Sequence, residues 1–293
     1  MQAYEIMKYY KDSEKAKKLL NQKVHPEIKI SQINSIKKHK MLNINEERYF
    51  AKPVNKKEMA SEIFFSRVYK QAGISVADYF PLGKHGFYTH VASNSIHEEN
   101  KHCVEAGTYF CYNSPRALNG IKGEEARNEI FHNVFYMPKR LEDQHVNYSD
   151  FITDDAMKKL QIIRALDVCS KNTDRHGSNY FFVVDENNIV VDVVCIDFSM
   201  SGKNLGLKHA EYFYYNEFTA DRLCEYELLK KMEDNEVLNT FVSPKELSEE
   251  VGAVDLLEVA RDVKGDFGFT VPQKMVDNAA RSFDIFSFGL TMV

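Results

Sequence analysis

The sequence predicts an α+β fold of two lobes, a small one over residues 1–93 and a larger, mainly helical one over 94–293. Two observations support this division. In the first part, short runs of β-branched and aromatic residues surround a single helix, and the strands are expected at 47–53, 74–80 and 87–93, the last two joined by a turn at 81–86. In the second part helical patterns dominate, after Thr153 and at 208–233, 244–263 and 273–287, with a loop-rich region over 96–150 that contains one helix at 124–136. A chain of 293 residues is long enough to bury a sizeable core.

The composition is that of a soluble globular protein, with 44% apolar and 28% charged residues. A net charge of −5 gives no basic surface of the kind that binds nucleic acid. The five cysteines include no C-x-x-C pair, which favours free thiols in a reducing compartment over disulfides or a zinc site. The sequence lacks the apolar run of a signal peptide at its start, and no stretch approaches the roughly 18 apolar residues of a membrane span. We therefore expect a cytoplasmic protein with no nucleic-acid partner and no stable membrane association.

The helix of the small lobe has clear signals at both ends. Asn55 and Glu58 have the spacing of a capping box, and Gly73 stands where a left-handed residue ends a helix. The residues expected to face the core are Ala60, Phe64, Phe65, Val68 and Ala72. Glu62 lies off this apolar stripe, and Lys52 lies on the strand that precedes the helix.

The stretch 172–199 holds the candidate reacting groups. A polar loop supplies Asp174 and Asn179, and Asp197 follows an apolar run. Phosphoryl transfer from ATP uses one aspartate to orient the attacking hydroxyl and accept its proton, and a second aspartate with an asparagine to hold Mg²⁺. The ion takes few protein ligands, all of them oxygen, so this donor set is sufficient.

A hairpin is predicted to bring these groups together. Two apolar runs, 180–184 and 189–196, are separated by the turn residues Asp-Glu-Asn-Asn at 185–188. A turn centred there places Asp197 opposite residues 176–178. The carboxylates and the amide are therefore expected at one end of one hairpin.

These motifs resemble those of known kinases. The spacing Asp-x-x-x-x-Asn is that of the protein-kinase catalytic loop, and Asp197-Phe198-Ser199 stands where that family has Asp-Phe-Gly. The order Asp-Arg-His-x-x-Asn followed by Ile-Asp-Phe resembles more closely the phosphatidylinositol 3/4-kinase superfamily. Within it, Asn-Thr-Asp-Arg-His-Gly-Ser-Asn at 172–179 resembles the HipA-like bacterial Ser/Thr kinases, including small stand-alone forms. The resemblance covers about residues 47–202.

The resemblance implies a two-lobed protein-kinase-like fold that uses ATP and Mg²⁺. Asp174 is the implied base, with His176 in a supporting role, and Asn179 and Asp197 are the implied magnesium ligands. Because only 46 residues precede Glu47, the N-terminal region by which HipA-like toxins contact a DNA-binding antitoxin is not expected here.

The small lobe is similar to that of HipA-like kinases as well. Lys52 is expected to contact the ATP phosphates, and Glu62 to hold Lys52. No glycine occurs before Gly73, so the Gly-rich loop that covers the phosphates in kinases is missing. A serine-containing loop with Ser31 and Ser35 is expected in its place, as an ATP-binding element and as a site of self-phosphorylation.

The expected function is ATP-dependent phosphoryl transfer to a serine or threonine of a protein that the sequence does not identify. Lipid phosphorylation is a first alternative, but no basic, membrane-seeking helix supports it. A pseudokinase that binds nucleotide or a partner without turnover is a second; the missing glycine loop favours it and the intact Asp174, Asn179 and Asp197 disfavour it. A metal-dependent hydrolase that uses the same carboxylates is a third.

Overall fold

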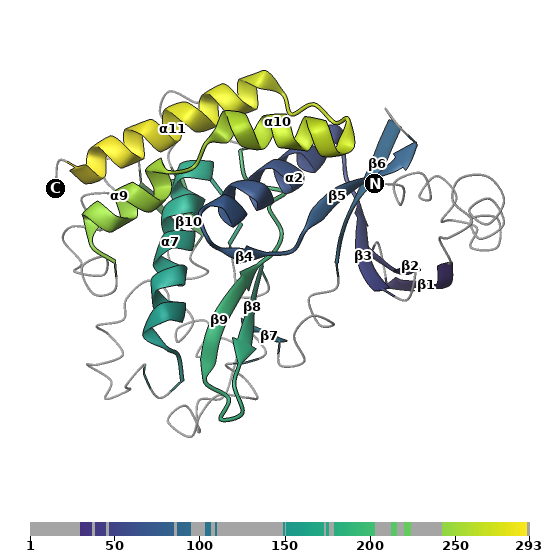
Figure 1. Ribbon diagram of the computed structural model, residues 1–293, viewed down its shortest axis with the longest axis horizontal. Helices are drawn as coiled ribbons and strands as arrows, with labels where there is room; N and C mark the ends of the chain where they lie inside the picture. The colour runs from purple at the N-terminus through teal and green to yellow at the C-terminus, as the bar shows by residue number, and fades with distance from the viewer. Residues whose placement is uncertain are drawn as a thin grey trace.

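The computed structural model describes residues 30–36, 39–44, 47–84, 87–94, 103–106, 109, 149, 151–172, 174–175, 179–202, 212–215, 220–223 and 242–291 (Figure 1). The predicted helix at 124–136 lies outside these residues. The mixed α+β composition of the fold is as predicted from the sequence.

The first sheet is antiparallel, with strand order β1-β2-β3-β6-β5. Its strands are β1 (Ile30–Ile36), β2 (His39–Ile44), β3 (Glu47–Pro53), β6 (Phe87–Asn94) and β5 (Tyr79–Lys84). The predicted strand 47–53 is confirmed as β3, and it places Lys52 opposite Val91 of β6.

The predicted loop at 31–35 is wrong. These residues form the middle of β1, and Ser35 pairs with Lys40 of β2. Three β-branched isoleucines, at 30, 33 and 36, favour a strand here once a neighbouring strand is available to pair with it. The connection between β1 and β2, residues 37–38, lies outside the described part of the chain. Because a paired strand is not a free loop, the reason for expecting self-phosphorylation within 31–35 is removed.

Helix α2 (Lys56–Gln71) confirms both predicted ends. The Asn55 side chain accepts from the backbone of Lys57 and Glu58, and the Glu58 carboxylate accepts from the Asn55 N–H over 3.1 Å. After the helix, Gly73 has a φ of +76°, a conformation that costs glycine nothing. The predicted apolar stripe is buried, but burial extends further round the helix and includes Glu62.

The second sheet has strand order β4-β9-β8-β7. Its strands are β4 (Ser75–Val76), β9 (Val190–Cys195), β8 (Tyr180–Val184) and β7 (Cys103–Glu105). The predicted strand 74–80 is therefore corrected: it is two strands in two sheets. β4 runs parallel to β9, with Ser75 opposite Val194, whereas β5 begins at Tyr79 in the first sheet.

The β8–β9 hairpin is as predicted. Oδ1 of Asp185 accepts from the backbone of Asn187 and Ile189, both over 2.8 Å, and Asn188 has a left-handed φ of 61°. Asparagine tolerates this conformation better than most residues. Helix α7 (Asp154–Ser170) packs on β9, and Thr153 caps it as predicted.

The C-terminal part was predicted less well. The predicted helix 244–263 is two helices, α9 (Pro244–Gly252) and α10 (Leu256–Phe267), because Asp255 caps a new helix. The last predicted helix is α11 (Gln273–Thr291). The predicted helix 208–233 is wrong, since β10 (Tyr212–Tyr215) and β11 (Ala220–Leu223) pair there as antiparallel strands. Four consecutive aromatic residues at 212–215 have a high strand propensity.

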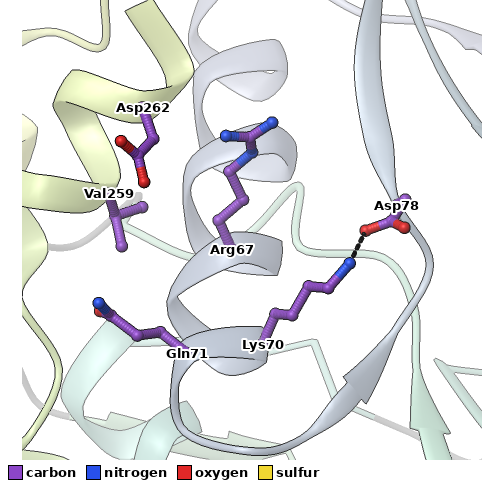
Figure 2. Close-up of a pocket in the computed structure, with 6 residues that line it drawn as sticks. All are labelled: Arg67, Lys70, Gln71, Asp78, Val259 and Asp262. Carbon is purple, nitrogen blue, oxygen red and sulfur yellow. Dashed lines mark hydrogen bonds and ion pairs between the residues drawn. The ribbon is translucent and has the colours of Figure 1, made fainter. Parts of the chain in front are cut away.

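Helix α10 lies along α2 (Figure 1). Arg67 of α2 pairs with Asp266 over 2.6 Å, and its guanidinium lies over the ring of Phe267. Figure 2 shows a pocket of about 370 Å³ beside this contact, crossed by the Lys70–Asp78 ion pair; its lining is Arg67, Lys70, Gln71, Asp78, Val259 and Asp262. Among the described residues no helix is both long and apolar enough to cross a membrane.

Candidate active site

Lys52 links the two sheets at the candidate site. Its ammonium nitrogen contacts Oε1 of Glu62 and lies 2.9 Å from Oδ1 of Asp197. The lysine comes from β3, the glutamate from α2 and the aspartate from the segment that follows β9. The sequence predicted the Lys52–Glu62 contact but not the contact with Asp197.

Burial and the shared lysine set the charges of this group. Burial raises the pKa of the fully buried Glu62 to about 7, against the opposing attraction of Lys52. For Lys52, burial is outweighed by Glu62 and Asp197, and its pKa is raised. For Asp197, burial is outweighed by Lys52 and by a hydrogen bond from Ser199, which hold the pKa below its ordinary value. A single lysine therefore faces two carboxylates, and Asp197, with a side chain 34% exposed, carries a negative charge open to a further cation.

Asp197 has a strained backbone held by several hydrogen bonds. Its φ is +55°, which is uncommon for a residue other than glycine. Its N–H donates to the Tyr79 hydroxyl over 3.0 Å, and the next N–H, of Phe198, donates to Oε2 of Glu62 over 2.8 Å. Ser199 donates its N–H and hydroxyl to Oδ1 of Asp197. Such outliers are found where surrounding structure and function require them.

Asn179 stands beside Asp197 at the end of the hairpin. The N–H of Ile196 donates to the carbonyl of Asn179 over 3.1 Å, so the ladder that pairs Tyr180 with Cys195 continues toward the loop. Asp197 directly follows Ile196 at this end of the hairpin, whereas the predicted partners of Asp197, residues 176–178, lie outside the described residues. The Asn179 amide donates to the carbonyl of Asp174 over 2.5 Å, which ties both ends of the loop together.

Asp174 presents an exposed side chain, whereas Asn179 is buried. Asn172 accepts from the Asp174 N–H over 3.2 Å and so fixes the start of the loop. His176 lies outside the described residues. The side chains of Ser31 and Ser35 also lie outside them, although the strand that carries both is described.

Sequence reasoning missed a buried network behind the loop. Asp167 of α7 and Arg175 form an ion pair over 3.0 Å with almost no exposure, and the Tyr69 hydroxyl of α2 donates to Asp167 over 2.7 Å. One signal was present: Asp167 lies between Leu166 and Val168 on the buried side of the helix, where an unpaired carboxylate is costly.

Comparison with known proteins gives a fold but no sequence family: no protein-family model and no curated protein matches the chain. A Helicobacter pylori proinflammatory kinase, CtkA, is similar in structure, with a TM-score of 0.53 and 13% identity over 89% of this chain and 92% of that one. The chain has a protein-kinase-like fold. HipA of Shewanella oneidensis, in complex with HipB and operator DNA, matches at a TM-score of 0.46 and 13% identity over all of this chain and 70% of its own.

Within this protein-kinase-like fold the described residues suit a nucleotide with Mg²⁺. The side-chain nitrogen of Asn179 donates to the Asp174 carbonyl, whereas its side-chain oxygen Oδ1 makes no hydrogen bond within the described residues. Oδ1 is therefore available as a neutral oxygen ligand at the end of the hairpin that also leads to Asp197. No cluster of three or more His, Cys, Asp or Glu side chains suited to a metal occurs in the described ranges. A softer transition metal therefore has no such site there, whereas Mg²⁺ is bound by few protein oxygens.

Proposed function

We propose that the protein transfers the terminal phosphoryl group of ATP to a serine or threonine hydroxyl of a protein. The observation that carries this proposal is Lys52 held between Glu62 and Asp197. A buried glutamate that fixes a strand lysine beside a metal-binding aspartate is the arrangement that kinases use to place nucleotide phosphates. A lysine needed only for solubility would lie in water, because lysine is rarely buried without a function or a partner.

Each polar group has one role in this reaction. Lys52 contacts the phosphates, and Glu62 keeps the lysine extended toward them. Asn179 and Asp197 would hold Mg²⁺, and the ion would supply positive charge to the phosphoryl group being transferred. Asp174, with its exposed side chain, orients the acceptor hydroxyl and accepts its proton, and His176 supports the loop.

The phosphate cover is assigned to the β1–β2 hairpin. This hairpin precedes β3 directly, as the phosphate-covering loop precedes the lysine strand in kinases. Ser31 and Ser35 are proposed to contact the nucleotide from β1. A protein acceptor rests on the resemblance to HipA-like kinases; no nucleic acid is proposed as a partner.

Transfer of radiolabel from the γ-phosphate of ATP tests the proposal. The purified chain is incubated with Mg²⁺ and an acceptor panel of a generic protein, phosphatidylinositol vesicles and no acceptor. Label on protein serine or threonine, absent with Asp174→Asn and Asp197→Asn, is the expected result. Label on the lipid alone would replace the acceptor class, and no transfer or ATP hydrolysis under any condition would overturn the proposed function.

A further inference from the structure

A buried ion pair lies behind the candidate loop. Asp167 and Arg175 are 2% and 5% exposed, and their charged atoms are 3.0 Å apart. Taking two charges out of water is costly, so a buried pair of this kind is weak evidence for a role in stability alone. Its contacts point to a role in placing the reacting groups.

Arg175 touches the backbone beside each proposed reacting residue. It directly follows Asp174 in the chain, and its Nη1 donates to the carbonyl of Ile196 over 2.6 Å and to that of Asn179 over 3.4 Å. Ile196 directly precedes Asp197. One planar guanidinium therefore hydrogen-bonds the loop to the ends of both strands of the hairpin. The fixed fork of donors on arginine allows this geometry, whereas the single ammonium group of a lysine does not.

Asp167 fixes the guanidinium from the other side. Arg175 donates to it from Nε over 3.1 Å and from Nη2 over 3.0 Å, and Asn172 donates over 3.0 Å. The Asp167 carboxylate thus accepts hydrogen bonds from Asn172, at the start of the loop, and from Arg175. Because α7 ends immediately before the loop, the helix serves as the base on which the loop is built.

Tyr69 brings α2 into the same network. Its hydroxyl donates to Asp167 over 2.7 Å and lies 3.1 Å from the Ser170 hydroxyl, while its ring packs edge-on against Phe198 at 4.9 Å. Tyr69 is two helical turns after Glu62 and on the same face of α2. Helix α2 therefore contacts Lys52 through Glu62 and is hydrogen-bonded through Tyr69 to Asp167, which anchors the loop.

We propose that Tyr69, Asp167 and Arg175 are positioning residues that couple the placement of α2 to the spacing of Asp174, Asn179 and Asp197. This inference rests on the proposed phosphoryl transfer. None of the three side chains is proposed to touch the substrate. A displacement of α2 weakens the grip on Lys52 and the anchor of the loop together, so the site is assembled as a unit.

Tyr69→Phe tests the coupling because it keeps the ring and removes only the hydroxyl. Tyr109→Phe is the matched control: Tyr109 is also fully buried, and its hydroxyl donates to the carbonyl of Asn188 over 2.6 Å with the carbonyl of Phe151 at 3.1 Å, away from the site. Both variants are compared with the wild-type chain by thermal unfolding and by phosphoryl-transfer kinetics at varied ATP and varied Mg²⁺.

Tyr69→Phe is expected to lower kcat about tenfold and to raise the Mg²⁺ concentration for half-maximal rate about tenfold, as loss of a residue that orients a metal ligand does. The KM for ATP is expected to rise as well, because a displacement of α2 also weakens the contact between Glu62 and Lys52. Tyr109→Phe is expected to lose similar thermal stability with wild-type kcat and Mg²⁺ dependence. Arg175→Lys, which keeps the charge but not the fork, is expected to lose more kcat than Tyr69→Phe.

The outcomes distinguish a failure of the coupling from a failure of the proposed phosphoryl transfer. Equal kcat and Mg²⁺ dependence for Tyr69→Phe and Tyr109→Phe would overturn the coupling and leave phosphoryl transfer standing. A wild-type chain that transfers no phosphate would overturn the proposed function, and this inference with it. If Arg175→Lys does not fold, the two tyrosine variants still decide the question.

Discussion

The Glu62 carboxylate holds Lys52 with one oxygen and the N–H of Phe198 with the other. Phe198 directly follows Asp197, so a single buried side chain fixes both the lysine and the segment that bears the proposed metal ligand. A change at Glu62 is therefore expected to affect two groups of the site at once.

The first prediction is that Lys52 and Glu62 are energetically coupled. Lys52→Ala should weaken ATP turnover, and Glu62→Ala should produce a milder form of the same defect. The double variant should lose less than the sum by about 1–2 kcal/mol, because residues in contact share one interaction. Turnover of the four proteins gives the coupling energy; full additivity would mean that the contact has no part in turnover.

The second prediction concerns pH. Burial raises the pKa of Glu62 from its ordinary 4.5 to about 7, so the folded protein holds a proton that the unfolded chain releases between these values. Stability should therefore fall as pH rises from about 4.5 to 7, by on the order of 3 kcal/mol for this group. Lys52 and Asp197 face Glu62, but their pKa values are shifted away from this window, upward and downward respectively.

Glu62→Gln removes the titrating group while keeping its shape. Urea unfolding of the metal-free and nucleotide-free protein at several pH values between 4.5 and 8 measures the effect. The wild type should lose more stability across the window than the variant. Identical slopes would show that Glu62 does not titrate there.

The third prediction separates the two aspartates. A ligand at about 100 times its dissociation constant adds roughly 2.7 kcal/mol of stability, and each kcal/mol raises the melting temperature of a chain of this size by about 2–4 °C. ATP with Mg²⁺ should shift the wild type more than ATP alone. Asp197→Asn should lose the Mg²⁺-dependent part and all turnover, whereas Asp174→Asn should keep most of the shift and still lose turnover. Wild-type transfer rates in both variants would refute the proposed roles.

The fourth prediction uses two helix caps as a matched pair. Asn55 caps α2 and Ser243 caps α9, each in a capping box. Replacement of either by alanine should cost about 1 kcal/mol, or about 2–4 °C in melting temperature. Only Asn55→Ala should also lower turnover, by up to about fivefold, because α2 carries Glu62. An equal loss of turnover in Ser243→Ala would indicate a general effect of destabilisation.

Local signals explain what the sequence predicted well. The caps of α2 and α7, the strand that carries Lys52 and the β8–β9 hairpin each depend on residues close in the chain. Because the hairpin has a defined turn, the proximity of Asn179 and Asp197 followed from sequence spacing alone.

Other features depend on partners far away in the chain. Whether residues 74–80 make one strand or two is decided by β9 and β6, which come later in the sequence. The ion pair of Asp167 with Arg175 and the hydrogen bond from Tyr69 join residues that no local sequence pattern links; Tyr69 lies 98 residues before Asp167. The signal that the sequence offers for this contact is a charged residue, Asp167, on the buried side of a helix, where it needs a partner.

The two-residue strand β4 has a mechanical consequence. Ser75 and Val76 are bonded into the second sheet beside β9, and the N–H of Ala77 donates to the carbonyl of Cys195 over 3.3 Å, while the chain enters the first sheet at Tyr79. The chain thus passes from the second sheet to the first through Ala77 and Asp78, next to the segment that bears Asp197. A displacement of the first sheet relative to the second would therefore act on the backbone only two residues before Asp197, because Ala77 is bonded to Cys195.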